Sequence, residues 1–236
     1  MIIRQLFERE SSTYTYLLGD EASREAVLID PVDTELDLYL RLLSELDLRL
    51  VAALDTHVHA DHITALGALR ERTACTTMVG FAGEVDCASE GLEEGKIIRV
   101  GGIAIDVLYT PGHTDDSFCF LVQDGATRYL FSGDTLLIRG TGRTDFQNGD
   151  PAQLYASLHR KLLLLPDDTW VYPAHDYKGW TVSTIGEEKR TNPRLEPATE
   201  AAFIELMNNL DLPNPKMMDV AVPANRACGR QAEGRG

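Results

Sequence analysis

Five of the six histidines of this chain belong to one pattern. Three lie in residues 56–62, which read Thr-His-Val-His-Ala-Asp-His, and His113 and His175 follow with Asp134 between them. Imidazole and carboxylate are ligands that zinc and non-haem iron prefer in proteins. Burying such groups together without a metal is costly, because each group needs a compensating partner. The pattern therefore predicts a metal site.

Each candidate ligand follows a predicted strand by a few residues. The pairs are residues 50–54 with His57, 103–109 with His113, 128–131 with Asp134, and 169–172 with His175. Sheet ends provide rigid positions, and the loops beyond them can direct side chains inward. Gly112 and Gly133 come just before two of the ligands and allow tight turns. We therefore expect four strand ends to build one site.

The spacing within the histidine segment predicts how its side chains are directed. In an extended segment alternate residues point the same way, so His57, His59 and Asp61 can face one cavity. A helix is expected over residues 63–72, with His62 opening it and Asp61 favouring its N-terminus. From spacing alone we expect two zinc ions. The first would bind His57, His59 and His113, the second would bind Asp61, His62 and His175, and Asp134 would bridge them.

Length and charge exclude several classes of protein. The 236 residues are expected to form a single domain over 1–236, with a short C-terminal extension from about 191. The formal net charge of -15 argues against nucleic acid and against anionic membrane surfaces, because both require a basic face. No apolar run reaches the length of a bilayer span, and the N-terminus does not resemble a signal peptide. We therefore expect a cytoplasmic protein.

The cysteines add to this expectation. Cys75, Cys87, Cys119 and Cys228 are scattered and form no Cys-x-x-Cys pair. A scattered arrangement in a cytosolic chain indicates reduced thiols rather than a disulfide framework.

The ligand pattern resembles the metallo-β-lactamase superfamily. The segment His57-x-His59-x-Asp61-His62, followed by His113, Asp134 and His175, matches the superfamily in order and spacing over about residues 1–190. The resemblance implies an αββα sandwich, in which two packed mixed sheets carry helices on their outer faces and the metal lies at one edge. The motif indicates fold and metal but not the reaction, because fold does not determine function.

A closer resemblance, to the persulfide dioxygenases, covers nearly the whole chain and includes loops without ligands. The matching segments are residues 14–20, 26–31, 56–64, 137–147, 172–177 and 221–225. The resemblance implies oxidation of glutathione persulfide by O₂ and water to sulfite and glutathione. It implies one iron(II) per chain on the catalytic residues His57, His113 and Asp134. Residues that would surround and orient these ligands are His59, Asp61, His62, His175 and Cys228.

Three residues are candidates for contact with the substrate. Arg139 and Arg143 follow Asp134, and a guanidinium is suited to bind the carboxylates of glutathione. Alternatively, each arginine anchors its loop by a salt bridge, for example to Asp145. Tyr177 could hydrogen-bond near the metal or be an ordinary half-buried tyrosine. For Cys228 the alternative is a buried inert thiol.

Two other functions stay open. A glyoxalase II-type hydrolase of glutathione thioesters would use the same residues with a dinuclear metal site and a metal-bound hydroxide. A non-catalytic module that binds metal or persulfide would hold the ion without turnover, although the complete ligand set argues against it. The sequence does not decide whether the chain forms a homodimer or has a sulfurtransferase (rhodanese) partner.

Overall fold

The structure is a computed structural model that describes residues 1–83, 85, 87–197, 199–213 and 217–229. The chain divides into two compact units. The first unit contains Met1–Leu92, Arg99–Ile103 and the segment from Pro213 onward, and the second contains Glu93–Ile98 and Ala104–Leu212. Each unit is built on helices and strands, so the α/β class expected from the sequence is confirmed.

The first unit contains a six-stranded mixed sheet in the order β1-β2-β3-β4-β5-β6. β1, β2 and β3 pair antiparallel, whereas β3, β4, β5 and β6 pair parallel. Parallel neighbours need long crossover connections, and helices supply two of them here. The strands are β1 (Ile2–Glu8), β2 (Thr13–Gly19), β3 (Glu25–Ile29), β4 (Arg49–Leu54), β5 (Thr76–Gly80) and β6 (Glu90–Leu92). The helices are η1 (Asp33–Glu35), α1 (Leu36–Glu45), α2 (Leu66–Thr73), η2 (Phe81–Gly83) and α6 (Met218–Arg226).

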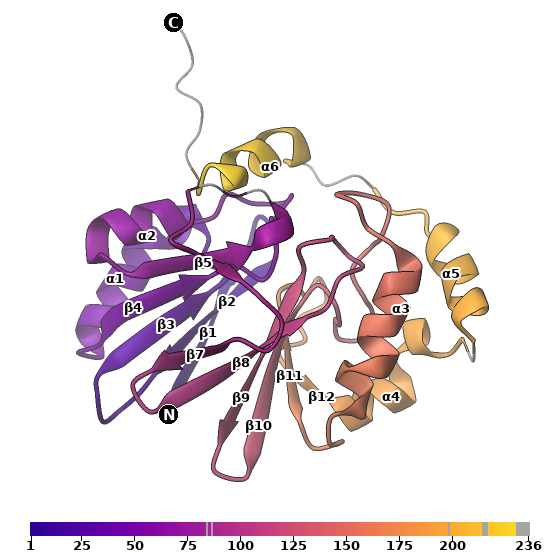
Figure 1. The fold of residues 1–236 in the computed structure, drawn as a ribbon, viewed down its shortest axis with the longest axis horizontal. Helices are drawn as coiled ribbons and strands as arrows, with labels where there is room; N and C mark the ends of the chain where they lie inside the picture. Colours follow the sequence, from indigo (N-terminus) through magenta and orange to yellow (C-terminus); the bar gives the residue numbers. More distant parts are fainter. Residues whose placement is uncertain (84, 86, 198, 214–216, 230–236) are drawn as a thin grey trace, which may run out of the picture. The chain divides into compact units, whose positions relative to one another are not determined.

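The core of the first unit lies between this sheet and helices α1 and α2 (Figure 1). Leu17 and Leu28 of the sheet are fully buried with Leu66 and Leu69 of α2. Tyr39 of α1 is also buried, and its hydroxyl accepts a hydrogen bond of 3.0 Å from the backbone N–H of Val32. This bond fixes the chain just after β3, where the histidine segment will be anchored.

The second sheet has the order β12-β11-β10-β9-β8-β7 and is also mixed, because β10 and β11 are parallel. In Figure 1, α3, α4 and α5 are grouped near its β10–β12 end. The strands are β7 (Ile97–Val100), β8 (Ile103–Tyr109), β9 (Phe118–Asp124), β10 (Thr127–Gly133), β11 (Trp170–Pro173) and β12 (Ser183–Thr184). The helices are α3 (Pro151–Arg160), η3 (Leu162–Leu164), α4 (Ile185–Thr191), η4 (Pro193–Leu195) and α5 (Glu200–Asn208).

Helix α3 fixes the turn that precedes His113. The Asp150 side chain caps the helix by accepting hydrogen bonds from the N–H groups of Ala152 and Gln153, and Pro151 occupies the first position. Gly112 has a φ of 139°, and a Cβ there would lie 2.3 Å from the backbone of Leu154. Only glycine therefore allows this turn to pack so closely on α3, as its position before His113 suggested.

Two expectations about local structure are wrong. Helix α2 begins at Leu66, so His62 does not open a helix and Asp61 does not lie at its N-terminus. Thr64 instead forms an isolated bridge with Val32, and its N–H donates to the Asn225 side chain, which keeps this segment extended. Helix α6 lies in the part of the chain that the sequence analysis described only as a short C-terminal extension.

The expectation of four reduced cysteines is wrong for two of them. Cys87 and Cys228 form a disulfide, whereas Cys75 and Cys119 are free and buried. The bonded pair is 141 positions apart in sequence, so no local spacing could indicate it. Within the described residues, none of the helices combines the length and hydropathy that crossing a bilayer requires.

Candidate functional site

Except for Cys228, the candidate residues of the first unit lie in one loop, residues 55–64, which we call the histidine loop. It follows β4, and its anchor is Asp30, the residue after β3. Asp30 is 1% exposed and has a φ of 52°, a left-handed conformation that aspartate tolerates better than most residues. Because β3 and β4 are parallel neighbours, their carboxyl ends place Asp30 beside the start of the loop.

Asp30 binds the histidine loop through both of its carboxylate oxygens. Oδ1 accepts hydrogen bonds from the Thr56 N–H at 2.7 Å and from the His59 ring at 3.1 Å. Oδ2 accepts from the Thr56 hydroxyl at 3.0 Å. A carboxylate that accepts several hydrogen bonds can stay ionised in a buried position.

These bonds determine which nitrogen each imidazole presents. The Thr56 hydroxyl uses its single proton on Asp30, so at 3.0 Å from His57 Nδ1 it must accept. His57 therefore carries its proton on Nδ1 and presents Nε2 as a lone pair. His59 donates Nε2–H to Asp30, so its Nδ1 carries the lone pair. Fixing a tautomer through the other ring nitrogen is typical of metal-ligating histidines.

His59, Asp61 and His62 form a group that could itself bind an ion. Their candidate ligand atoms all lie within 4.8 Å of one another. His62 Nδ1 lies 3.0 Å from the Asp61 carboxylate, and the rings of His59 and His62 are 4.3 Å apart between centroids. The first unit therefore carries more ligand groups than a single ion needs.

In the second unit, His113 and Asp134 lie together at the ends of β8 and β10. The backbone carbonyl of Arg143 lies 2.7 Å from His113 Nδ1. Because a carbonyl can only accept, Nδ1 carries the proton and Nε2 presents a lone pair. That Nε2 lies 3.5 Å from Asp134 Oδ2. The arrangement matches a histidine and a carboxylate prepared for one metal ion.

The other oxygen of Asp134 also fits a metal ligand. Oδ1 is buried and has no hydrogen-bond partner among the described residues, and it lies 3.8 Å from His175 Nε2. A buried carboxylate oxygen without a partner is costly unless a cation binds it. These residues therefore fit the metal that the sequence predicts.

A turn of residues 134–143, here called the Asp134 turn, fixes these two ligands through its backbone. The Gly142 N–H donates to the Asp134 carbonyl at 2.7 Å. A Cβ at Gly142 would lie 2.4 Å from that oxygen and 2.7 Å from the His113 ring. Glycine is therefore required for the turn to approach the imidazole this closely.

Both candidate substrate arginines are already paired with carboxylates. Arg143 binds Asp145 through two hydrogen bonds of 2.6 and 2.8 Å, which is the salt bridge that the sequence offered as an alternative. This hydrogen bond lowers the pKa of Asp145, although partial burial acts in the opposite direction. Arg139 pairs with Glu187 and with Glu188, which is fully buried. Binding of substrate by either arginine stays a prediction.

Tyr177 and Cys228 differ from their simplest interpretations. Tyr177 is not half-buried but 72% exposed, and its ring lies parallel to that of His175 with 6.1 Å between centroids. Cys228 is not an inert thiol, because its sulfur is bonded to Cys87. Whether either residue acts in the reaction stays a prediction.

Sequence reasoning missed three residues that position the site. Glu188 had no motif of its own, whereas Asp30 ends a predicted strand in the matching segment 26–31, but its role was not predicted. Asn225 lies in a segment that resembled the persulfide dioxygenases, but its role was not predicted. It donates hydrogen bonds of 2.8 Å to the carbonyls of His59 and His62.

The sequence matches the metallo-beta-lactamase superfamily over residues 9–80 and 89–175. It is 48% identical to the human protein named persulfide dioxygenase ETHE1, mitochondrial, over 98% of this chain and 90% of the human protein. The crystal structure of ETHE1 from Myxococcus xanthus is 58% identical and superposes with a TM-score of 0.94, covering 98% of this chain and 100% of that one.

The chain belongs to the persulfide dioxygenase family. The metallo-β-lactamase fold expected from its motifs is confirmed by the same matches. A probable hydroxyacylglutathione hydrolase of Schizosaccharomyces pombe is 30% identical over 87% of this chain and 90% of its own length. The hydrolase alternative is therefore the more distant of the two families.

Proposed function

We propose that this chain is a persulfide dioxygenase that oxidises glutathione persulfide with O₂ and water to sulfite and glutathione. The single observation that carries the proposal is the match to persulfide dioxygenases over 98% of the chain, which extends well beyond the metal motif. We also propose that the enzyme acts in the cytoplasm, as we expect from the sequence.

We further propose that one iron(II) binds to His57, His113 and Asp134. Two histidines and one carboxylate are a ligand set typical of non-haem iron oxygenases. Iron(II) bound in this way supplies open coordination positions for the persulfide sulfur and O₂, and the electrons that activate O₂. The structure supports this ligand set through the orientation of each residue. His57 and His113 each present Nε2, and Asp134 has a buried oxygen without a hydrogen-bond partner in the described chain.

The surrounding residues have separate tasks in this proposal. Asp30 keeps the tautomers of His57 and His59 fixed through the hydrogen bonds described above. His175 is buried beside the candidate ligand Asp134, with 3.8 Å between its Nε2 and the Oδ1 of that carboxylate. The exposed ring of Tyr177, stacked on His175, offers a surface for the peptide part of glutathione.

The first test is to follow dissolved O₂ with an electrode when iron-loaded protein meets freshly made glutathione persulfide. We expect rapid uptake with sulfite as the product, and loss of uptake in His113→Ala. His159→Ala is the matched control, because His159 lies on α3 and stacks on Tyr155 rather than on any ligand. Its O₂ uptake should equal that of the wild type.

The second candidate function is hydrolysis of a glutathione thioester. The observation that favours it is the group His59, Asp61 and His62, whose ligand atoms are close enough for a second ion. If zinc-loaded protein hydrolyses S-lactoylglutathione and iron-loaded protein consumes no O₂, the assignment moves to the hydrolases.

A further inference from the structure

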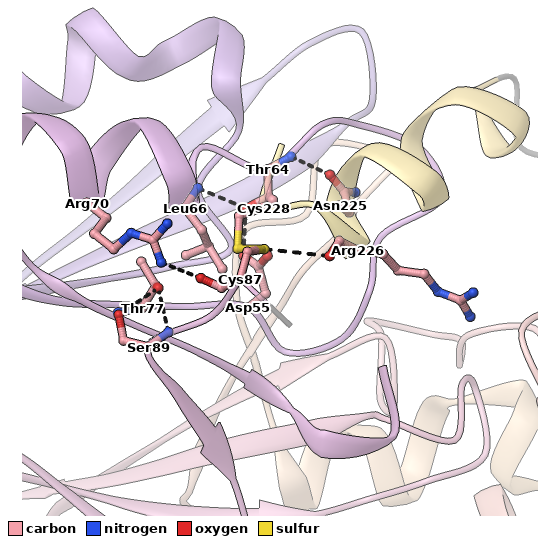
Figure 2. Close-up of a disulfide and its surroundings, with 10 residues drawn as sticks. All are labelled: Asp55, Thr64, Leu66, Arg70, Thr77, Cys87, Ser89, Asn225, Arg226 and Cys228. Carbon is pink, nitrogen blue, oxygen red and sulfur yellow. Dashed lines mark hydrogen bonds between the residues drawn. A yellow bond between two sulfur atoms is a disulfide. The ribbon is translucent and has the colours of Figure 1, made fainter. Parts of the chain in front are cut away.

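The disulfide joins two segments of the first unit that are far apart in sequence. Cys87 lies in the loop between η2 and β6, and Cys228 follows the last turn of α6. Figure 2 shows the two sulfurs bonded beneath the end of α6, with Asn225 and Thr64 close by. The Cys87 sulfur also lies 3.6 Å from the Arg226 carbonyl oxygen. The bond therefore attaches α6 directly to the β5–β6 connection.

Helix α6 in turn fixes the histidine loop through one side chain. The Asn225 amide donates to the carbonyls of His59 and His62, and its oxygen accepts from the Thr64 N–H, each at 2.8 Å. Asn225 is only 3% exposed. Both amide protons and the amide oxygen are thus used on the loop that carries the candidate metal ligands. Any movement of α6 would break these bonds.

Besides the disulfide and Asn225, a backbone contact holds the end of this segment, because the Gly67 N–H of α2 donates to the Cys228 carbonyl at 3.1 Å. Apart from Asn225, the buried residues of α6 are Ala221 and Ala224, whose methyl side chains remove little apolar surface from water. Val220 is 53% exposed. Cys228 itself has a φ of 56°, a left-handed conformation that is unfavourable for a residue with a β-carbon. We therefore expect the covalent bond to contribute substantially to holding α6 in place.

The two cysteines of the disulfide differ in their exposure to solvent. Cys228 is 2% exposed, whereas Cys87 is partly exposed. The guanidinium of Arg70 donates to the Cys87 carbonyl, which places a positive charge near the more accessible sulfur. A thiolate anion approaching from solution is attracted by this charge in a chain whose net charge is -15. Cys228 is also among the residues that line a hollow of about 270 Å³ with Thr64 and Gly67.

We propose that the Cys87–Cys228 disulfide is a thiol-exchange site for a low-molecular-weight thiol, and that opening it releases the Asn225 hydrogen bonds to the histidine loop. The thiolate attacks the Cys87 sulfur, the bond between the two cysteines breaks, and Cys228 leaves as a thiolate that takes a proton from water. A second thiolate attacks the mixed disulfide and releases Cys87. Two thiols are oxidised to one disulfide while the protein disulfide is reduced, and the reverse reaction closes the bond again.

The choice of glutathione as the thiol rests on the proposed function, because glutathione is the product of that reaction. The dioxygenase would then release the reductant of its own disulfide. Accumulating glutathione would open the bond and loosen the loop that carries His57, His59 and His62. Glutathione disulfide, which is reduced to two glutathione molecules as the bond closes, would restore the loop.

The first experiment counts accessible thiols by alkylation of the denatured protein after incubation in glutathione buffers of different ratio. We expect two alkylated cysteines, Cys75 and Cys119, in oxidised buffer and four in reduced buffer. Intermediate ratios should give a single glutathione adduct on Cys87. Four alkylated cysteines in every buffer, or a pair that stays closed in excess reduced glutathione, would overturn the proposal.

The second experiment measures hydrogen exchange of the histidine loop in the protein as purified, before and after reduction. We expect the Thr64 N–H, which donates to Asn225, to exchange about tenfold faster after reduction. Cys87→Ser should show the fast rate in either buffer, and Cys75→Ser, which alters a buried free cysteine, should behave as the wild type. Equal rates in the oxidised and reduced wild type would contradict the proposal, even if Cys87→Ser fails to fold.

Neither experiment requires turnover or persulfide. A failure of the O₂ assay would therefore leave this proposal standing, and a failure of these two experiments would leave the dioxygenase assignment standing.

Discussion

The histidine loop of the first unit and the Asp134 turn of the second present metal ligands in two different ways. The loop is fixed by a buried side chain, because Asp30 accepts hydrogen bonds from Thr56 and His59. The turn is fixed by backbone, because His113 donates to the Arg143 carbonyl and the Gly142 N–H donates to Asp134.

This difference indicates which kind of substitution should disturb the ligands of each region. A ligand oriented by a side chain can be disturbed by changing that side chain alone. A ligand oriented by backbone tolerates most changes of side chain but not an added β-carbon where the backbone approaches closely. Four substitutions test this contrast, each with a control in the same region or of the same residue type.

Asp30→Asn should have the largest effect. The new amide would donate to the Thr56 hydroxyl, which would then donate to His57 Nδ1 and shift the His57 proton to Nε2. We expect metal affinity to fall about 10–100-fold and the free energy of unfolding to fall by about 2–3 kcal/mol. Chelator competition and urea unfolding measure these two quantities. The exposed Asp37→Asn is the control, and an unchanged metal affinity in Asp30→Asn would refute the role of Asp30.

Glu188→Gln tests the second unit at a distance from its ligands. Glu188 accepts hydrogen bonds from Arg139, from Ser183 at 2.6 Å and from Asn192 at 2.9 Å, and it is fully buried. We expect a loss of about 3 kcal/mol in urea unfolding, because the buried ion pair with Arg139 is broken and the new amide nitrogen cannot accept the hydrogen bonds that the carboxylate oxygen accepts. Metal affinity should change far less than in Asp30→Asn, since backbone orients His113.

The control for Glu188→Gln is its neighbour. Glu187 also pairs with Arg139, but its side chain is 39% exposed. Glu187→Gln should therefore cost less than about 1 kcal/mol. Equal losses in the two variants would show that burial is not the decisive difference.

Gly142→Ala adds one β-carbon to the Asp134 turn. It would meet the Asp134 carbonyl oxygen at 2.4 Å, so the turn must shift at a cost of about 1–3 kcal/mol. Thermal unfolding and metal affinity should both register the change. In Gly140→Ala the nearest atom, the Cβ of Leu137, would lie at 3.8 Å, and we expect a change within about 0.5 kcal/mol. If Gly140→Ala proves as harmful as Gly142→Ala, close approach is not the reason.

Asp145→Asn should have the smallest effect on the free energy of unfolding. We expect to detect it mainly in how that free energy changes with pH. The hydrogen bond with Arg143 lowers the pKa of Asp145 in the folded state. The stability from this pair is therefore fully present above the unfolded pKa of about 3.9 and is lost as pH falls through the lower folded value. The side chain is 54% exposed, so solvent screening limits the contribution to less than about 1 kcal/mol.

The measurement is the difference in unfolding free energy between wild type and Asp145→Asn, followed from neutral to acidic pH. The difference should shrink toward low pH. The exposed Asp168→Asn serves as the control, and a difference that grows on acidification would show that the sign is wrong.

The sequence predicted the strands that carry the ligands because each combines apolar residues with a following turn. β4, β8, β10 and β11 all lie where they were expected, give or take two residues. It misplaced the start of α2, because the bridge between Thr64 and Val32 and the bond to Asn225 override the helical pattern of residues 63–72. Local pattern cannot report a partner 161 residues away.

Partners that are distant in sequence also explain which features of the candidate site the sequence did not predict. The motif gave the candidate ligands, but the tautomers of His57 and His113 depend on Thr56, Asp30 and a backbone carbonyl, which only the folded chain brings near. The disulfide depends on the same long-range folding. The seven motif residues are compatible with one metal ion or with two. The group His59, Asp61 and His62 does not decide between these two numbers.

The contact between Thr64 and Asn225 also has a consequence for biosynthesis. These residues are 161 positions apart, so at about 5–20 residues per second a ribosome needs roughly 8–30 s between them. During that interval the nascent chain already carries the three histidines of the histidine loop but lacks helix α6, which orders that loop. The loop matures only near the end of translation, and a metal ion bound earlier would meet an unfinished site.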